Sequence, residues 1–344
     1  MDTLLGDPIR SKLMRESGFI WLQSGGLVMR ILVVGAGALG GYFGACLLRF
    51  GRDVTFLVRA QRAAQMAREG LRVIGKGGDF AVAAPTVLAT ELHETFDLIL
   101  VAVKAYSFDE AVEQFAPVVG PSTAIVPILN GIRHIDQLVA RFGANRVLGG
   151  VAKISATLDA DGRVVLLFPL AELVFGELGG GVSERTTALS GELGDAGFTA
   201  QRSDVIMQDM GEKWMIVSTV AGITCLMRAS IGEIIAAQDG QSAILRLFAE
   251  NCAVGTAAGF GPRQSFIDTT MSYLTQTGSP LKASMLRDIE RGAPTEGDHM
   301  LGDLLRRARS LGVSTPILEL ANAHVSAYEA SRAQAKELGS ALSQ

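Results

Sequence analysis

A glycine motif between an apolar run and a helical pattern constrains the fold of this chain more than any other feature. Residues 31–34 have the length and the β-branched composition of a buried strand. Gly35, Gly37 and Gly40 follow in the spacing G-x-G-x-x-G, and the apolar residues then recur at helical spacing. A second strand-like run at residues 54–58 completes a β-turn-α-β unit of the kind that binds dinucleotides.

Each glycine has a physical role in that unit. Gly35 lets the chain turn out of the strand, Gly37 leaves room for a pyrophosphate, and Gly40 lets the helix pack closely on the sheet. The N-terminus of the helix offers unpaired N–H groups and the positive end of its dipole to the phosphates. We therefore expect the cofactor to contact Gly35, Gly37, Ala38, Leu39 and Gly40.

The residue after the second strand indicates which dinucleotide binds. An NAD-binding unit usually carries Asp or Glu there, where the carboxylate accepts a hydrogen bond from the ribose 2′-OH. This chain has Arg59 at that point, and no carboxylate occurs between Val54 and Arg68. Because a cation suits a 2′-phosphate, we predict NADP(H) as the cofactor.

Composition excludes several classes of protein. The chain has 344 residues, 48% hydrophobic and 19% charged, and a net charge of −4, which suits two globular domains and gives no electrostatic case for nucleic acid. Three scattered cysteines and four histidines without ligand spacing predict no metal site and a reducing, cytoplasmic environment. The uncharged stretches are glycine-rich or short, which argues against a membrane protein.

The sequence pattern divides the chain into three parts. Residues 1–29 lack a secretory signal and are expected to be a disordered extension, with Met29 as a candidate start of the native protein. Residues 30–203 alternate strands and helices, whereas residues 204–344 are helical, with helix boundaries marked by Gly and Pro. We therefore predict an α/β Rossmann-type N-terminal domain followed by an all-α C-terminal domain.

Two polar residues follow strands of the N-terminal half. Lys104 comes after the apolar run 96–103, and Asn130 comes after the run 124–129. Because ligands of open α/β sheets bind beyond the carboxyl ends of the strands, we expect both side chains near the cofactor.

The chain resembles the ketopantoate reductase (2-dehydropantoate 2-reductase) family over about residues 30–335. The resemblance rests on the G-A-G-A-L-G loop, Arg59, V-A-V-K-A-Y at Lys104, L-N-G at Asn130, E-K-W at Lys213, and S-M-L-R-D-I-E-R-G-A-P-T-E at residues 284–296. Family members pair a Rossmann-type domain with a helical domain and reduce a 2-keto acid with NADPH in the cleft between them. The resemblance implies this activity, and with it a place in pantothenate biosynthesis.

The resemblance also implies the catalytic pair, Lys213 and Glu296. Aligning the helix on R-A-S-I-G-E places the family lysine at Lys213 without a gap, whereas aligning on Trp214 would place Ile216 there. Hydride transfer to a ketone builds negative charge on its oxygen, which a positioned ammonium group can stabilise and protonate.

Four further residues would line the cleft if the resemblance holds. Ser284 matches the serine that holds the substrate carboxylate, and Asp288 lies one helical turn beyond it. Lys104 and Asn130 match residues at the nicotinamide end, and we also expect Asn130 to contact the substrate.

The chain departs from the family pattern at Val217 and Ala221. The family usually has asparagines at these positions, four and eight residues after the lysine, so ketopantoate itself is less expected than the reductase class. One alternative is a related NADP-dependent dehydrogenase or imine reductase with a more apolar substrate. Another is a non-catalytic NADP(H)-binding sensor. We expect a small-molecule 2-keto acid as the binding partner. A homodimer is the oligomeric state that we expect if the protein is not a monomer.

Overall fold

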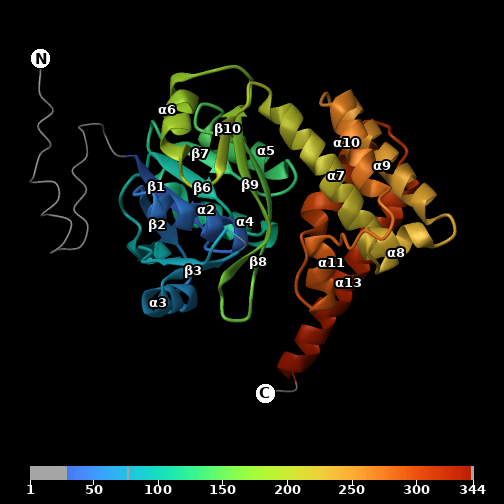
Figure 1. Ribbon diagram of the computed structural model, residues 1–344, viewed down its shortest axis with the longest axis horizontal. Helices are drawn as coiled ribbons and strands as arrows, with labels where there is room; N and C mark the ends of the chain where they lie inside the picture. The colour runs from blue at the N-terminus through green and yellow to red at the C-terminus, as the bar shows by residue number, and fades with distance from the viewer. Residues whose placement is uncertain (1–28, 76, 342–344) are drawn as a thin grey trace, which may run out of the picture.

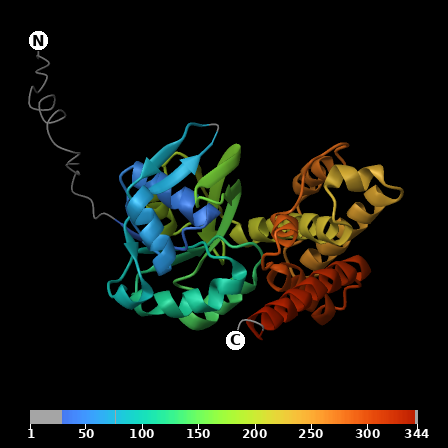
Figure 2. The ribbon, with the colours of Figure 1, turned by 90° about the horizontal axis from the view of Figure 1, so that it is seen from below.

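The computed structural model describes residues 29–75 and 77–341. These residues form an N-terminal α/β domain, blue to green in Figure 1, and a C-terminal helical domain, yellow to red. The long helix α7 (Ile206–Met227) begins at the first domain and runs into the second, as Figures 1 and 2 both show. The prediction that residues 1–29 are disordered concerns residues outside the described ranges, apart from Met29.

A five-stranded parallel sheet forms the centre of the N-terminal domain, in the order β5-β2-β1-β6-β7. Its strands are β1 (Arg30–Val34), β2 (Asp53–Leu57), β5 (Thr86–Val87), β6 (Leu98–Val101) and β7 (Ala124–Pro127). Val34 of β1 is in register with Leu57 on one side and with Val101 on the other. The winding of the chain therefore reverses at β1, and the carboxyl end of this strand is where such a sheet binds its ligand.

The two faces of this sheet pack against different partners. Leu32 and Val34 belong to the core formed with the helices α4 and α5, which continues into the helical domain. Ile31 and Val33 belong to the core formed with α2 and a second sheet. Burial on both faces explains why the strand is continuously apolar rather than alternating.

The helices of this domain are α2 (Ala38–Arg49), α3 (Ala60–Glu69), α4 (Phe108–Phe115), α5 (Arg133–Phe142) and α6 (Glu184–Leu193), with short turns η1 (Ala89–Glu91), η2 (Ala105–Ser107) and η3 (Ala116–Val118).

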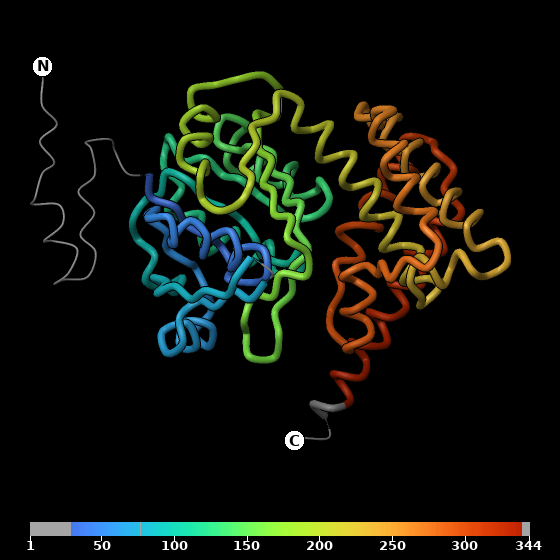
Figure 3. The backbone as a smooth tube through the Cα atoms, viewed as in Figure 1, coloured from blue at the N-terminus to red at the C-terminus, as the bar shows by residue number. Residues whose placement is uncertain are grey.

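The second sheet has the order β10-β9-β3-β4, and β8 also pairs with β9. Its strands are β3 (Leu71–Ile74), β4 (Phe80–Val82), β8 (Leu148–Leu158), β9 (Val164–Glu177) and β10 (Thr199–Arg202). β8 and β9 form a long antiparallel hairpin whose register shifts between Ile154 and Ala156. The turn of this hairpin projects from the domain in Figure 3.

The C-terminal domain is built around α7, which follows β10 after a three-residue segment, 203–205. Its other helices are α8 (Ile231–Ala236), α9 (Gly240–Ala257), α10 (Gln264–Leu274), α11 (Ser284–Glu290), the π-helical turn η4 (Asp298–Gly302), α12 (Asp303–Ser310) and α13 (Pro316–Ala341). Trp214 of α7 is fully buried, and its indole N–H donates to the carbonyl oxygen of Met300 over 3.1 Å.

The predicted fold class, an α/β domain followed by a helical domain, is confirmed. The expected boundary between residues 203 and 204 falls in the segment that separates β10 from α7. Among the described residues, none of the helices combines the length and apolarity that a membrane span requires.

Candidate active site

The glycine turn has the shape that a bound pyrophosphate requires. Gly35 adopts a φ of +96°, and its N–H donates to the carbonyl oxygen of Leu57 over 3.0 Å, which ties the turn to the end of β2. A Cβ atom at Gly40 would lie 2.1 Å from the carbonyl oxygen of Gly35, so only glycine allows α2 to begin this close to the strand. A Cβ atom at Gly37 would meet nothing within 4 Å.

The start of α2 suits an anion. Gly37 is the N-cap and provides no side-chain hydrogen bond, and the first turn contains no acidic residue. The first N–H groups of a helix have no partner within the helix, and no side chain caps them here, so they are available to phosphate oxygens. The residues present fit a dinucleotide.

Arg59 lies where the sequence analysis expects the cation for a 2′-phosphate. It is the N-cap of α3, two residues beyond the end of β2. Its guanidinium Nη2 lies 2.5 Å from Oε2 of Glu110 on α4, and both side chains are largely exposed. No local sequence pattern predicts this partner, because the two residues lie 51 positions apart.

A lysine and two carboxylates join the two domains. Lys104 follows β6, and its Nζ donates to Asp288 Oδ2 and to Glu296 Oε2, each over 3.2 Å. The backbone N–H of Ala105 donates to the other oxygen of Glu296 over 3.0 Å. Burial disfavours the charged form of Lys104, but Glu296 and Asp288 outweigh it and raise the pKa of this lysine. Lys104 is therefore held as a cation between the domains.

Lys213 lies half-buried on α7. Its Nζ donates to the carbonyl oxygen of Ala152 on β8 over 2.8 Å. Burial lowers the pKa of Lys213 to about 8, against an opposing attraction from Glu296, and the neighbouring charge of Lys153 lowers it further. An amine with this pKa exchanges protons readily near neutral pH.

Two contacts and one electrostatic interaction link Lys213 with the glycine turn. A Cβ atom at Gly35 would lie 2.9 Å from a methyl group of Val103, so the turn touches the residue before Lys104. Lys104 contacts Glu296, and Glu296 interacts electrostatically with Lys213. The structure therefore places Lys104 in contact with Glu296, and Lys213 within the electrostatic influence of Glu296.

Asn130 lies beside a buried histidine pair that sequence reasoning missed. Gly131, with a φ of +82°, approaches the ring of His299 so closely that a Cβ atom there would lie 3.3 Å from it. His299 Nε2 lies 3.2 Å from Nδ1 of His134, which is fully buried on α5. Burial lowers the pKa of both imidazoles, so the pair is neutral near pH 7 and packs as part of the domain junction.

Tyr106 is a second residue that the sequence analysis did not single out. It is 55% exposed on the turn after Lys104. Its pKa is raised, mainly by burial, and it interacts with the charges of Lys104, Glu296 and Arg59. Its place in the V-A-V-K-A-Y motif was the available signal.

Two of the three predicted substrate-binding residues, Ser284 and Asp288, lie on α11, and the third, Asn130, follows β7. Ser284 is exposed at the start of α11, and Asp288 follows one turn later, where it accepts from Lys104. Val217 is half-buried on α7, one turn after Lys213, and Ala221 is buried one turn further. The face of α7 that continues from the lysine is therefore apolar.

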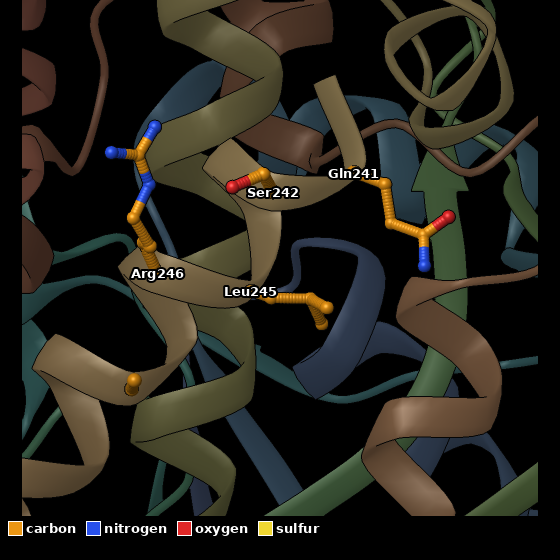
Figure 4. Close-up of a pocket in the computed structure, with 5 residues that line it drawn as sticks. Gln241, Ser242, Leu245 and Arg246 are labelled. Carbon is orange, nitrogen blue, oxygen red and sulfur yellow. The ribbon is translucent and has the colours of Figure 1, made fainter. Parts of the chain in front are cut away.

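A pocket elsewhere in the molecule does not resemble this site. It lies against α9 and is lined by Gln241, Ser242, Leu245, Arg246 and Ala249, all from one helix (Figure 4). Within residues 29–75 and 77–341, no cluster of His, Cys, Asp and Glu could hold a metal ion.

Family models match both domains of this chain. The model described as ketopantoate reductase PanE/ApbA matches residues 31–180, and the model of its C-terminal domain matches residues 205–329. The chain belongs to the ketopantoate reductase PanE/ApbA family. YkpB of Bacillus subtilis, described as an uncharacterized oxidoreductase, is 35% identical over 88% of this chain and 100% of its own length. The 2-dehydropantoate 2-reductase of Mesorhizobium japonicum is 27% identical over 85% of this chain and 95% of its own length.

A solved structure shares the fold. The ternary structure of D-mandelate dehydrogenase with NADH and anilino(oxo)acetate has a TM-score of 0.79 and 24% identity, and the match covers 88% of this chain and 99% of that one. The predicted family is thus confirmed. Membership places the chain among the oxidoreductases.

Proposed function

We propose that the protein reduces a small 2-keto acid to the 2-hydroxy acid with NADPH. The observation that carries this proposal is the Lys104–Glu296 contact at the domain junction, next to a glycine turn shaped for a dinucleotide, with Lys213 under the electrostatic influence of Glu296. Membership of the ketopantoate reductase PanE/ApbA family supports it.

The residues have distinct roles in this proposal. A bound nicotinamide supplies the hydride that reduces the carbonyl carbon. The Lys213 ammonium stabilises the negative charge that develops on the carbonyl oxygen and then donates its proton to that oxygen, and water returns a proton to the amine. Glu296 favours the protonated form of Lys213. Its hydrogen bonds with Lys104 and with the backbone of Ala105 also hold the helical domain against the α/β domain.

Arg59 and the absence of a carboxylate at the end of β2 support NADPH as the preferred cofactor. Ser284 is the proposed contact for the substrate carboxylate, with Asp288 and Lys104 beside it. Asn130 would meet both the cofactor and the substrate, next to the positive-φ turn at Gly131.

The apolar face at Val217 favours a substrate less polar than ketopantoate. A site that hydrogen-bonds a substrate hydroxyl needs polar partners, and this chain has Val217 and Ala221 where its family has asparagines. We therefore propose a 2-keto acid with an apolar side chain, or a related imine. If ketopantoate is the substrate, the reaction belongs to pantothenate biosynthesis. We also propose a cytoplasmic location and a homodimer.

A panel of carbonyl compounds tests this proposal. NADPH consumption with bulky apolar 2-keto acids should exceed consumption with ketopantoate, and Val217→Asn should shift the ratio of kcat/KM values about tenfold toward ketopantoate. Met227→Asn, at the exposed end of the same helix, is the matched control and should leave the ratio unchanged. Tight NADPH binding without turnover of any 2-keto acid, carbonyl compound or imine would favour the sensor instead.

The depressed pKa of Lys213 predicts a pH dependence. Reduction needs the ammonium form, which is lost as pH rises through about 8. We expect kcat/KM for reduction to be flat below about pH 7 and to fall about tenfold per unit well above pH 8, while oxidation of the hydroxy acid rises over the same interval. Steady-state rates at subsaturating substrate check this, and a reduction rate that stays constant to about pH 10 contradicts the role of Lys213.

A further inference from the structure

An ion pair spans the carboxyl end of β1, above the glycine turn. Arg59 follows β2, and Glu110 lies on α4, which follows β6; β1 lies between these two strands. The two side chains nevertheless meet, with Arg59 Nη2 2.5 Å from Glu110 Oε2. Because adjacent strands lie about 4.8 Å apart, the pair crosses about 10 Å of the edge at which a dinucleotide binds.

Glu110 is the carboxylate of α4 that faces this edge. Asp109, the residue before it, accepts a hydrogen bond from Gln137 on α5. Glu113, one turn later, pairs with Arg141 of the same helix α5. Glu110 pairs with Arg59 instead, and its other carboxylate oxygen accepts a hydrogen bond from the side chain of Gln114 over 3.1 Å.

The Arg59–Glu110 pair contributes little to the stability of the fold. The side chains are 70% and 55% exposed, and exposed ion pairs of this kind are weak because water and salt screen them. The ion pair itself therefore explains little of why a carboxylate stands here, although the first turn of α4 favours one. The effect of this carboxylate on a charged ligand at the same edge is larger, because the ligand must share Arg59 with it.

The two nicotinamide dinucleotides respond to Glu110 in opposite ways. A 2′-phosphate carries close to two negative charges, so it competes with Glu110 for Arg59 and is repelled by the carboxylate. A ribose 2′-OH is a donor, and a carboxylate at this edge can accept its hydrogen bond. We infer that Glu110 is a specificity-determining residue that weakens NADPH binding relative to NADH and makes the site accept both cofactors. This inference rests on the proposed function, which assigns Arg59 to the 2′-phosphate.

Direct binding measurements on the full-length protein, without any carbonyl substrate, test the inference. In Glu110→Gln, NADPH should bind about fivefold tighter at low salt, and NADH should bind equally or about twofold weaker. Titration of the intrinsic fluorescence of each reduced dinucleotide gives both dissociation constants. The gain for NADPH should shrink at about 0.5 M salt, because the charges are exposed and screened.

Two variants of neighbouring residues complete the design. Glu113→Gln removes a carboxylate from the same helix, also paired with an exposed arginine, and should change neither affinity. Arg59→Gln should weaken NADPH binding about tenfold and leave NADH nearly unchanged.

The outcomes separate this inference from the proposed function. Any of three results overturns the role of Glu110. The first is a wild-type ratio of NADPH to NADH affinity in Glu110→Gln, and the second is the same change in that ratio in Glu113→Gln. The third is unchanged NADPH affinity in Arg59→Gln. Failure to reduce any carbonyl compound contradicts the proposed reaction but leaves the binding ratios to decide the role of Glu110. If neither dinucleotide binds, both proposals are overturned.

Discussion

Substituting alanine for Lys213 should lower kcat at least about a thousandfold while NADPH affinity stays within about twofold of the wild type. The substitution removes both the charge that stabilises the developing oxyanion and the proton that the oxygen receives. It should leave the glycine turn and Arg59 intact, because the hydrogen bond of Lys213 goes to Ala152 on β8 and to neither of them. Single-turnover rates with NADPH, together with fluorescence titration of the cofactor, separate the two effects.

Lys153→Ala is the matched control for that experiment. Lys153 lies on β8 next to Ala152, pairs with Glu172, and affects Lys213 only by lowering its pKa. Its removal should leave kcat within a few-fold of the wild type and move the alkaline limb of the pH profile slightly upward. A Lys213→Ala variant that keeps more than about a tenth of the wild-type kcat would show that the proton comes from another group.

Glu296→Gln should lower kcat/KM about a hundredfold at pH 7.5, the second largest effect that we expect. Glu296 is 8% exposed and accepts from Lys104 and from the backbone of Ala105. Its negative charge also opposes the fall in the pKa of Lys213. Without that charge the lysine loses its proton at a lower pH, so the fall in the reduction rate should begin about one pH unit earlier.

Glu290→Gln controls for the loss of a carboxylate in the same segment. Glu290 ends α11 and pairs with Lys282 over 3.0 Å, at the surface. Its substitution should leave both the rate and the pH profile unchanged. If Glu296→Gln lowers the rate without moving the profile, Glu296 acts by holding the domains together rather than by tuning Lys213.

The dinucleotide-binding unit was predictable from the sequence because its determinants are local. A buried strand, three glycines and a helix are adjacent in the chain, and the close approach that requires glycine at position 40 is to the carbonyl oxygen of Gly35, only five residues earlier. The division into an α/β and a helical domain was predictable for the same reason, since hydrophobic periodicity reports secondary structure residue by residue.

The residues of the candidate site were identified from family motifs, and the structure brings Lys104, Asp288 and Glu296 into contact. The catalytic roles of Lys213 and Glu296 stay predictions that the two variants above test. The departure at Val217 was also visible in the sequence. Its consequence, an apolar face one turn from Lys213, depends on the helix that carries both residues.

The partners of these residues were decided by the tertiary structure alone. Glu110 reaches Arg59 across 51 positions, the carbonyl of Ala152 reaches Lys213 across 61, and His299 reaches His134 across 165. No local pattern encodes such pairs, because they depend on which strands are neighbours and on how the helical domain docks. The sequence by itself determined where a dinucleotide can bind and which groups are available for chemistry. The docking of the two domains brought the charge of Glu296 to bear on the half-buried Lys213, and the order of the strands in the first sheet placed Glu110 beside Arg59.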